Sequence, residues 1–262
     1  MSALHEFKYG VLHFLQSKQR HGVHSPFVYE FMDKVMHLPL PNEAESAIER
    51  RRAELKKRDI HFERIDLGAG SRKGVRNASN LAKVVSDAAS NAKEARAIAN
   101  FCKYIRAKKI IELGSNVGIG TSYISSANPE AELHSIEGDP FLSDVAKESI
   151  QALVPNHFVT IHTGSFEDEL PRLLSHLQEI DVLFIDGNHR KNPTLNYVHW
   201  ALPFLSDDAA IIVDDIYWSR EMTEAWNTIC ALPNFNLALD FFHFGIIQKT
   251  RRKEKEYFKL RL

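Results

Sequence analysis

The chain has 262 residues, 44% of them hydrophobic, which is enough for one α/β domain with a large core and an extension. A formal net charge of −1 and a pI near 6.9 give no overall attraction to nucleic acid, so no nucleic-acid partner is expected. No signal peptide opens the chain, and no stretch approaches the ~18 apolar residues of a membrane span. We therefore expect a soluble, cytoplasmic protein with no membrane partner.

The first sixty residues are expected to be helical. Apolar and aromatic residues recur at helical spacing over 7–15 and 27–32, and a charged helix is predicted over 43–58. Between the first two helices lies the segment from His21 through His24 to Phe27, in which Ser25 and Pro26 have the pattern of an N-cap followed by a first-turn proline.

Residues 61–92 are less regular. Residues 65–71 imitate a cofactor-binding turn, but no acidic strand end follows about 20 residues later, so we interpret them as an ordered loop. A polar helix is predicted over 77–90. Residues 1–90 are thus predicted to form a helical N-terminal extension. It could close the site as a lid, with His21, His24 and Phe27 over the carboxyl edge of the sheet, or form a homodimer interface.

From about residue 91 to the end of the chain, strands and helices alternate, which is typical of a parallel sheet with helices on both faces. Strands are predicted at 109–113, 132–137, 159–163, 181–186 and 209–215, and helices at 92–106, 140–153, 166–176 and 220–232. Residues 236–242 and 244–249 are too close together for a crossover helix and should pair antiparallel. The expected fold of residues 91–262 is α/β: Rossmann-like, with a seven-stranded, mostly parallel sheet and a C-terminal antiparallel strand.

A glycine-rich turn follows the first of these strands. Its order is Glu112-x-Gly114-x-x-x-Gly118-x-Gly120, whereas dinucleotide-binding folds use the tighter G-x-G-x-x-G with room for a pyrophosphate. Glycine permits positive φ and a close approach of the backbone to a ligand. An acidic residue at the strand end suits a cationic ligand without phosphate, and S-adenosylmethionine is such a ligand.

A second acidic residue supports this interpretation. Glu137 ends the next strand, 23 residues after Gly114, close to the ~20 expected for a carboxylate that binds a ribose diol. A carboxylate can accept hydrogen bonds from both hydroxyls. The plainer alternative is a tight βα turn at the glycines and a solvated strand end at Glu137.

With these motifs, residues 78–249 resemble the class I S-adenosylmethionine-dependent methyltransferases. Within that family they are similar to the small-molecule O-methyltransferases of the catechol, caffeoyl-CoA and macrolide-sugar type, and the first sixty residues look like the extensions of bacterial members. The matching segments are 112–121, 135–140, 164–167, 184–189 and 212–216. The resemblance implies O-methylation of a small-molecule hydroxyl. It also implies cofactor contacts at Glu112, Gly114, Ser115, Gly118, Gly120, Thr121, Glu137, Gly164, Ser165 and Asp186.

Three carboxylates at the ends of the fourth and fifth strands suggest a metal site. Asp186, Asp214 and Asp215 should meet at the carboxyl edge of the sheet, where open α/β folds bind ligands. Three carboxylates repel one another unless a cation compensates, and oxygen-only ligands suit Mg²⁺ or another hard divalent cation. Metal-dependent O-methyltransferases have Asp, Asp and Asn or Asp at the matching positions. In the alternative without metal, Asp186 contacts the cofactor amine and Asp214 or Asp215 caps the next helix.

His189 is the candidate general base, with Asp186 beside it in the catalytic set. It follows Asp186 by three residues, at the position where catechol-type members of the family have a lysine. A histidine with a pKa near ~6.5 can accept a proton from a hydroxyl at neutral pH. The alternative is a surface or helix-start histidine. Trp218 is either a wall of the acceptor site or a packing residue.

Other function classes fit less well. A dehydrogenase needs the G-x-G-x-x-G turn, amino-methylating DNA enzymes carry a Pro-Pro-aromatic motif, and a C5-cytosine enzyme needs a Pro-Cys nucleophile; the sequence has none of them. The remaining rival is a catalytically inert S-adenosylmethionine-binding protein that acts as an interaction module.

Overall fold

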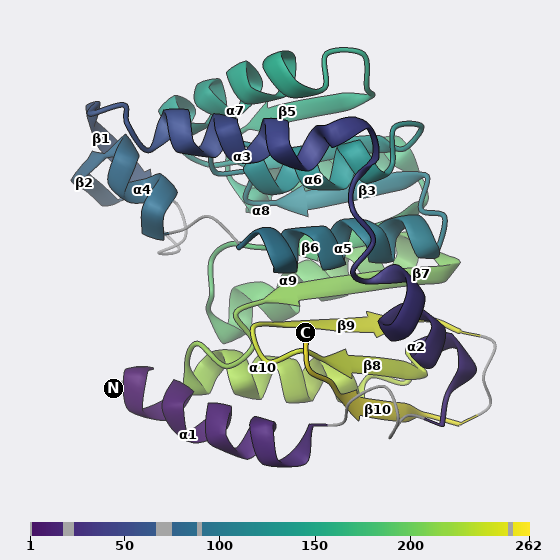
Figure 1. The fold of residues 1–262 in the computed structure, drawn as a ribbon. Coiled ribbons are helices and arrows are strands. Elements are labelled where there is room, and N and C mark those ends of the chain that lie inside the picture. The colour runs from purple at the N-terminus through teal and green to yellow at the C-terminus, as the bar shows by residue number, and fades with distance from the viewer. Residues whose placement is uncertain (1, 18–23, 67–74, 88–90, 251–253) are drawn as a thin grey trace.

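The computed structural model describes residues 2–17, 24–66, 75–87, 91–250 and 254–262 (Figure 1). Its centre is an eight-stranded sheet with the order β10-β8-β9-β7-β6-β3-β4-β5. The strands are β3 (Lys109–Leu113), β4 (Glu132–Glu137), β5 (Val159–Thr163), β6 (Ile180–Ile185), β7 (Leu205–Asp214), β8 (Leu237–Asp240), β9 (Phe244–Gln248) and β10 (Glu256–Lys259). Within this sheet, only β9 runs antiparallel to its neighbours, β7 and β8.

The fold class expected from the sequence is confirmed, with one strand more than predicted. The three strands β3, β4 and β5 have the predicted bounds, and β8 and β9 form the predicted antiparallel hairpin. The additional strand, β10, pairs parallel with β8 at the edge of the sheet. Its sequence, Glu-Tyr-Phe-Lys, is short and charged at both ends, so it has no buried-strand pattern.

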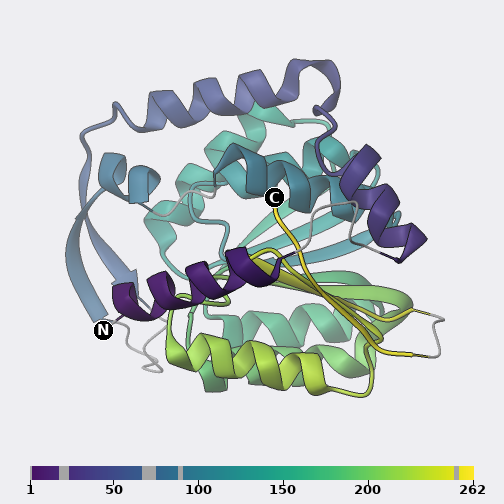
Figure 2. The same cartoon turned by 60° about the horizontal axis from the view of Figure 1, so that its bottom comes forward.

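Helices cover both faces of the sheet (Figures 1 and 2). One face carries α5 (Ala92–Tyr104), α6 (Ile119–Ala127) and α7 (Pro140–Leu153), and the other carries α8 (Phe166–Leu177), α9 (Lys191–Ala201) and α10 (Arg220–Ala231). Alternate strand residues enter two separate cores: Ile110 and Val182 lie in the first, Ile111 and Leu183 in the second. Both faces are therefore apolar, which explains the continuous hydrophobic runs in the central strands.

The N-terminal extension is helical only in part. It begins with α1 (Ser2–Gln16), α2 (Pro26–Glu30), η2 (Phe31–Val35), η3 (Pro41–Glu43) and α3 (Ala44–Leu55). Ser25 caps α2 as predicted, accepting a hydrogen bond from the backbone N–H of Val28. Helix α3 forms a second layer outside α6 and α7.

The predicted loop and polar helix after residue 61 are wrong in part. Strand β1 (His61–Asp66) pairs antiparallel with β2 (Val75–Asn80), and the helix α4 that follows is shorter (Leu81–Asp87). Residues 75–80 lack an apolar face of their own, so their pairing with β1, rather than their sequence pattern, makes them a strand. The glycines of the imitated cofactor turn, at 68 and 70, lie outside the described residues.

The predicted position of the lid is also wrong. Phe27 packs on Tyr104 at the C-terminal end of α5, with the ring centroids 4.8 Å apart, and α5 runs from the carboxyl edge to the amino edge of the sheet. The hairpin β1–β2 and α4 lie at the opposite end of the sheet from α2 (Figure 1). His21 lies outside the described residues. The extension therefore reaches the carboxyl edge through its hairpin and through α1, where His5 lies 3.0 Å from Thr223 and Tyr9 stacks on Tyr217.

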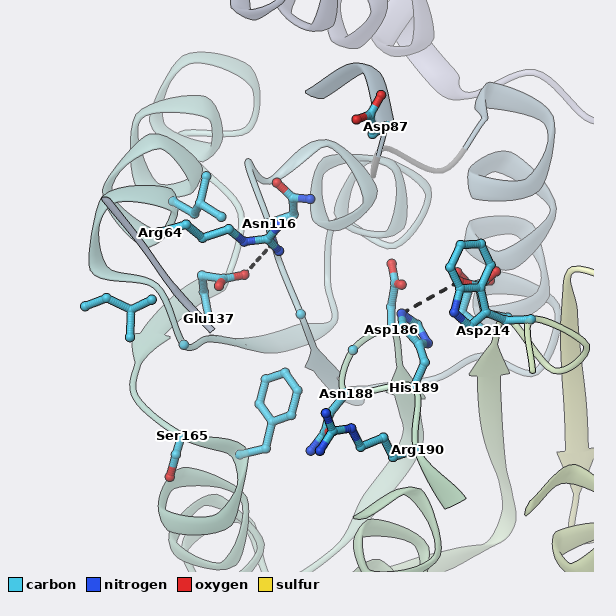
Figure 3. Close-up of a pocket in the computed structure, with 18 of the residues that line it drawn as sticks. Arg64, Asp87, Asn116, Glu137, Ser165, Asp186, Asn188, His189, Arg190 and Asp214 are labelled. Atoms are coloured by element: carbon cyan, nitrogen blue, oxygen red, sulfur yellow. Dashed lines mark hydrogen bonds and ion pairs between the residues drawn. The ribbon is translucent and has the colours of Figure 1, made fainter. Parts of the chain in front are cut away.

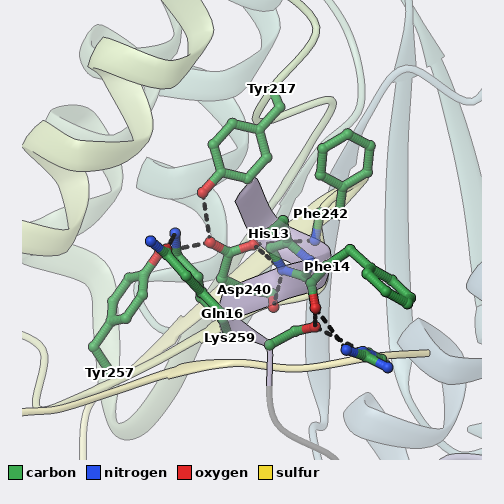
Figure 4. A network of polar contacts seen from close by, with 10 residues as sticks. His13, Phe14, Gln16, Tyr217, Asp240, Phe242, Tyr257 and Lys259 are labelled. Atoms are coloured by element: carbon green, nitrogen blue, oxygen red, sulfur yellow. Dashed lines mark hydrogen bonds and ion pairs between the residues drawn. The ribbon is translucent and has the colours of Figure 1, made fainter. Parts of the chain in front are cut away.

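A buried carboxylate ties α1 to the C-terminal strands (Figure 4). Asp240, fully buried at the end of β8, lies 3.1 Å from Nε2 of His13 and accepts hydrogen bonds from the hydroxyls of Tyr217 and Tyr257 at 2.7 and 2.6 Å. Burial alone would raise the pKa of Asp240, but hydrogen bonds from His13, Tyr257 and Tyr217 bring it below its ordinary value. The carboxylate is thus held ionised.

None of the helices within the described ranges is long and apolar enough to span a membrane. The cytoplasmic location stays a prediction from the sequence.

We expect Asp240→Asn to lower the free energy of unfolding by roughly 1.5–3 kcal/mol, because charge-assisted hydrogen bonds become neutral ones. Urea unfolding at pH 7 measures this change. Since the folded pKa is depressed, the contribution is present above pH ~4 and is lost at lower pH, so the two proteins should converge there. Asp144→Asn, at an exposed site, is the control and should change stability by less than about 0.5 kcal/mol.

Candidate active site

A cavity of about 660 Å³ opens at the carboxyl edge of the sheet (Figure 3). Its walls come from the turn after β3, the ends of β4, β6 and β7, the start of α8, and from β1, α4 and the start of α5. This is the edge at which open α/β sheets bind ligands.

The turn after β3 depends on two glycines. Gly114 has φ +106°, and a Cβ there would lie 2.1 Å from the backbone oxygen of Asp186. Gly118 has φ +79°, and a Cβ there would lie 3.0 Å from the backbone oxygen of Ala146. Gly120, by contrast, sits in α6 with room for a methyl group, since its nearest neighbour would be 3.5 Å away. Glycine is thus required at 114 and 118, where backbones meet.

Glu112 lies beneath the cavity rather than on its surface. Its carboxylate is buried and accepts hydrogen bonds from the hydroxyls of Thr121 and Ser135, both at 2.5 Å. Burial raises the pKa of Glu112 to about 7. Glu112 and Thr121 therefore join β3 to α6 from below, as supports for the glycine turn. Gly164 likewise adds nothing to the cavity wall.

Glu137 faces the cavity at the end of β4. One carboxylate oxygen accepts the backbone N–H of Asn116 at 2.8 Å, and the other accepts that of Asp139 at 3.0 Å. Burial raises the pKa of Glu137 to about 7, against the effect of these two hydrogen bonds. The side chain is thus fixed at the mouth of the glycine turn, with its remaining acceptor positions available to a ligand.

Buried polar atoms without a partner surround the same turn. The hydroxyl oxygen of Ser115 and the side-chain oxygens of Asn116 and Asn188 are buried and have no hydrogen-bond partner in the described structure. Asn116 and Asn188 line the cavity. Such atoms are costly unless something satisfies them. Their presence fits a site built for a polar ligand.

The predicted carboxylates divide into two groups. Asp186 and Asp214 lie partly buried at the ends of β6 and β7, near enough to affect each other's ionisation; desolvation raises the pKa of both. Asp215 turns instead toward His189, with its carboxylate oxygen 3.7 Å from Nε2. Neither Asp214 nor Asp215 caps α10, because the cap is Ser219, whose hydroxyl accepts the N–H of Met222. That part of the metal-free alternative is wrong.

The donor chemistry of Asp186 and Asp214 fits a hard divalent cation, since both offer carboxylate oxygens in a strongly negative environment. Within the ranges that the structure describes, however, no three His, Cys, Asp or Glu side chains converge as a metal site. Of the three predicted metal ligands, Asp186 and Asp214 lie together, whereas Asp215 pairs with His189.

The loop that carries His189 is anchored from below. The side-chain amide of Asn188 donates to the hydroxyl of Tyr197 at 2.8 Å, and that hydroxyl donates to Glu167 at 2.6 Å. Ser165 begins α8 as its N-cap, accepting the N–H of Asp168 at 3.1 Å, and also lines the cavity. His189 is half-buried, and desolvation lowers the pKa of its imidazole despite the opposing charge of Asp215.

Several cavity residues were not identified from the sequence. Arg64 and Asp87 come from the extension, Glu94 from α5 and His243 from the turn before β9. Trp218, by contrast, was considered from the sequence as a wall residue, and it is half-exposed on the cavity wall. No short motif marks the first four, because the fold alone brings these segments together. Asn116, inside the glycine turn, could have been identified from its place in the motif.

Comparison with known proteins agrees with this geometry. Residues 111–216 match the family model described as a methyltransferase domain. The chain is also 30% identical over 136 residues to O-methyltransferase imqG of Aspergillus flavus, an alignment that covers 50% of this chain and 54% of that protein. The alignment thus spans about half the length of the curated relative.

Solved structures share the fold at low sequence identity. The O-methyltransferase TomG from Streptomyces achromogenes, solved in complex with SAM, superposes with a TM-score of 0.58 at 17% identity, covering 85% of this chain and 95% of that one. An O-methyltransferase from Bacillus cereus in complex with SAH gives 0.55 at 16% identity, covering 81% and 91%. Residues 111–216 thus match a methyltransferase domain, and the chain has the Rossmann-like fold of these solved structures, so the resemblance inferred from the motifs is confirmed.

We expect Gly114→Ala to destabilise the fold by about 3 kcal/mol or more, because the new methyl group meets the backbone of Asp186 at a positive φ. Thermal unfolding and the yield of folded protein measure the effect. Gly120→Ala is the matched control and should leave stability unchanged or raise it by up to about 1 kcal/mol, as expected in a helix. Equal behaviour of the two variants would contradict this account of the turn.

Proposed function

We propose that the chain is an S-adenosylmethionine-dependent methyltransferase that O-methylates the hydroxyl of a small molecule. The observation that carries the proposal is the cavity at the carboxyl edge, where Glu137 and the turn at Gly114 face Asp186 and His189. The methyltransferase-domain match over residues 111–216 and the similarity to named O-methyltransferases support it.

The cavity suits this cofactor in charge and in shape. Glu137 would accept the two ribose hydroxyls, and Asn116 and Asn188 would satisfy their buried oxygens with its polar groups. Desolvation raises the pKa of Asp186 and Asp214, and a bound sulfonium would favour their ionised forms and be stabilised by them. Ser165 and Phe166 would form the wall beside the adenine. Six further residues would support this surface from below without lining it: Glu112, Ser115, Gly118, Gly120, Thr121 and Gly164.

Methyl transfer depends chiefly on bringing the reacting groups together. The residues would hold the acceptor oxygen ~3 Å from the electrophilic methyl group, in line with the bond from that group to sulfur. The cofactor supplies that group. His189 would remove the hydroxyl proton, because an imidazole with a lowered pKa is neutral at pH 7 and has a free lone pair. Asp215 would stabilise the imidazolium that forms.

The proposal also includes a divalent cation at the acceptor site. Asp186 and Asp214 would hold it. Asp215, the third ligand predicted from the sequence, faces His189 instead. Such an ion lowers the pKa of a bound hydroxyl and so makes it easier to deprotonate.

A homodimer also stays a prediction from the sequence. Helix α1 exposes Phe7, Val11, Phe14 and Leu15 along one side, which is where a partner copy would be sought.

Calorimetric titration with S-adenosylhomocysteine tests the central proposal. The unmodified chain should bind it, and Glu137→Ala should weaken binding by up to about 10²- to 10⁴-fold, because two charge-assisted hydrogen bonds are lost at roughly 1.5–3 kcal/mol each. Glu130→Ala, at an exposed site before β4, is the control. Unchanged affinity in the Glu137 variant would remove Glu137 from the cofactor site.

His189→Ala should lower the methylation rate with catechol-like acceptors about 10²-fold at pH 7. Since burial lowers the pKa of His189, the unmodified enzyme should keep its rate down to pH ~6.5 and lose it at more acid pH, as the imidazole becomes protonated. His199→Ala, on the exposed side of α9, should behave like the unmodified enzyme. Cofactor binding without turnover of any acceptor would favour the inert interaction module instead.

Chelation tests the cation. We expect EDTA to suppress turnover and Mg²⁺ to restore it, and Asp214→Asn to weaken Mg²⁺ binding in calorimetry by about tenfold or more, because a charged ligand is lost. Asp208→Asn, exposed on the same strand, is the control. Full activity in EDTA would show that the carboxylates act without metal.

A further inference from the structure

We infer that Arg64, on the hairpin of the extension, is a positioning residue of the cofactor site that holds the Glu137 carboxylate in its ionised form. It lies outside the matched residues 111–216, so the domain match does not account for it. The inference rests on the proposed function, because the ribose of the cofactor is the group that an ionised Glu137 would bind.

The hairpin is attached to the segment that carries Glu137. The backbone N–H of Ile65 donates to one carboxylate oxygen of Asp139 at 2.6 Å, and the other oxygen of Asp139 accepts the N–H of Leu142 as the N-cap of α7. The backbone N–H of Asp139 in turn donates to Glu137. Strand β1 and Glu137, the carboxylate that would bind the ribose, are therefore both hydrogen-bonded to the buried Asp139.

Apolar contacts support this attachment. The ring of Phe62 stacks on that of Phe141 at the start of α7, with centroids 4.3 Å apart. Leu81, directly after β2, is fully buried, and its N–H donates to the carbonyl of Ile60. Because side chains alternate along a strand, fixing Phe62 fixes Arg64 on the same face two residues later. These contacts thus fix the described part of the hairpin as one wall of the cavity.

Arg64 and Glu137 line the same end of the cavity, and the guanidinium extends toward Asn116 and Glu137 in Figure 3. Three acidic groups also act on or near Glu137: Asp139 beside it, Glu112 below and Asp186 across the cavity. Asp139 and burial oppose ionisation of Glu137, and the charge of Glu137 in turn raises the pKa of Glu112 and of Asp186. Arg64 provides positive charge that favours ionisation of Glu137, in addition to the two backbone N–H donors.

This balance matters at physiological pH. Burial raises the pKa of Glu137 to about 7, so near neutrality a small change in the surrounding charge alters the ionised fraction strongly. Without the charge of Arg64 the pKa rises further, and fewer molecules offer a carboxylate to the ribose. At pH 9 the carboxylate is ionised in either case.

The test is the affinity for S-adenosylhomocysteine between pH 6 and 9, measured by calorimetry on the full chain. Arg64→Gln should bind about 3- to 10-fold more weakly at pH 7, with the midpoint of its pH dependence shifted upward and the difference narrowing toward pH 9. Arg64→Lys, which keeps the charge, should restore most of the affinity. Arg58→Gln removes an arginine from the same extension that pairs with Glu148, away from the cavity, and should match the unmodified chain.

Three results would overturn the inference. In the first, Arg64→Gln binds as tightly as Arg58→Gln. In the second, the loss is the same at every pH, which indicates a merely structural role. In the third, Arg64→Lys is as weak as Arg64→Gln, so that charge is not the cause. If the unmodified chain itself does not bind S-adenosylhomocysteine, the proposed function fails and this inference fails with it.

Discussion

The close approach of two backbones at Gly114 is the constraint on which the site depends. The end of β6 passes so near the end of β3 that the carbonyl of Asp186 occupies the space of a side chain at position 114. The N–H of Asp186 donates to the carbonyl of Leu113, and that of Gly114 donates to Ile136 on β4. Three strand ends are joined there, and the carboxylates that follow them face one cavity as a result.

A cluster of carboxyl groups is the second property of the site. Glu112 is buried at this edge of the sheet and Glu137, Asp186 and Asp214 are partly buried there, and desolvation raises the pKa of each. A folded protein maintains such a group of acids at a cost in stability, since desolvation and mutual repulsion both oppose ionisation. A bound cationic ligand relieves that cost. The electrostatics of this edge therefore favour a sulfonium or a metal ion over an anionic ligand such as a dinucleotide.

The extension adds to the site through packing rather than through a motif. Asp139 caps α7 and also receives the N–H of Ile65, so the hairpin is attached where the cofactor carboxylate is fixed. At the other end of the extension, the buried Asp240 anchors α1 to the last strands through His13. The extension thus contacts the domain at several places: at the cavity through its hairpin, at the last strands through α1, and on α5, α6 and α7 through α2, η2 and α3.

The sequence by itself determined the α/β domain, because its central strands are apolar on both faces and glycine and carboxylate follow the strand ends at fixed spacing. It also determined Gly114, Glu137, Asp186 and His189 as residues of one edge, since parallel strands bring their carboxyl ends together. Only the tertiary structure decided what depends on contacts between distant segments. Residues 75–80 became a strand by pairing with β1, β10 by pairing with β8, and Arg64 reached the cavity because Asp139 holds its strand. Glu112 turned inward because Thr121 and Ser135 provide its partners. A local pattern cannot encode these outcomes, because each depends on a hydrogen-bond partner that lies elsewhere in the chain.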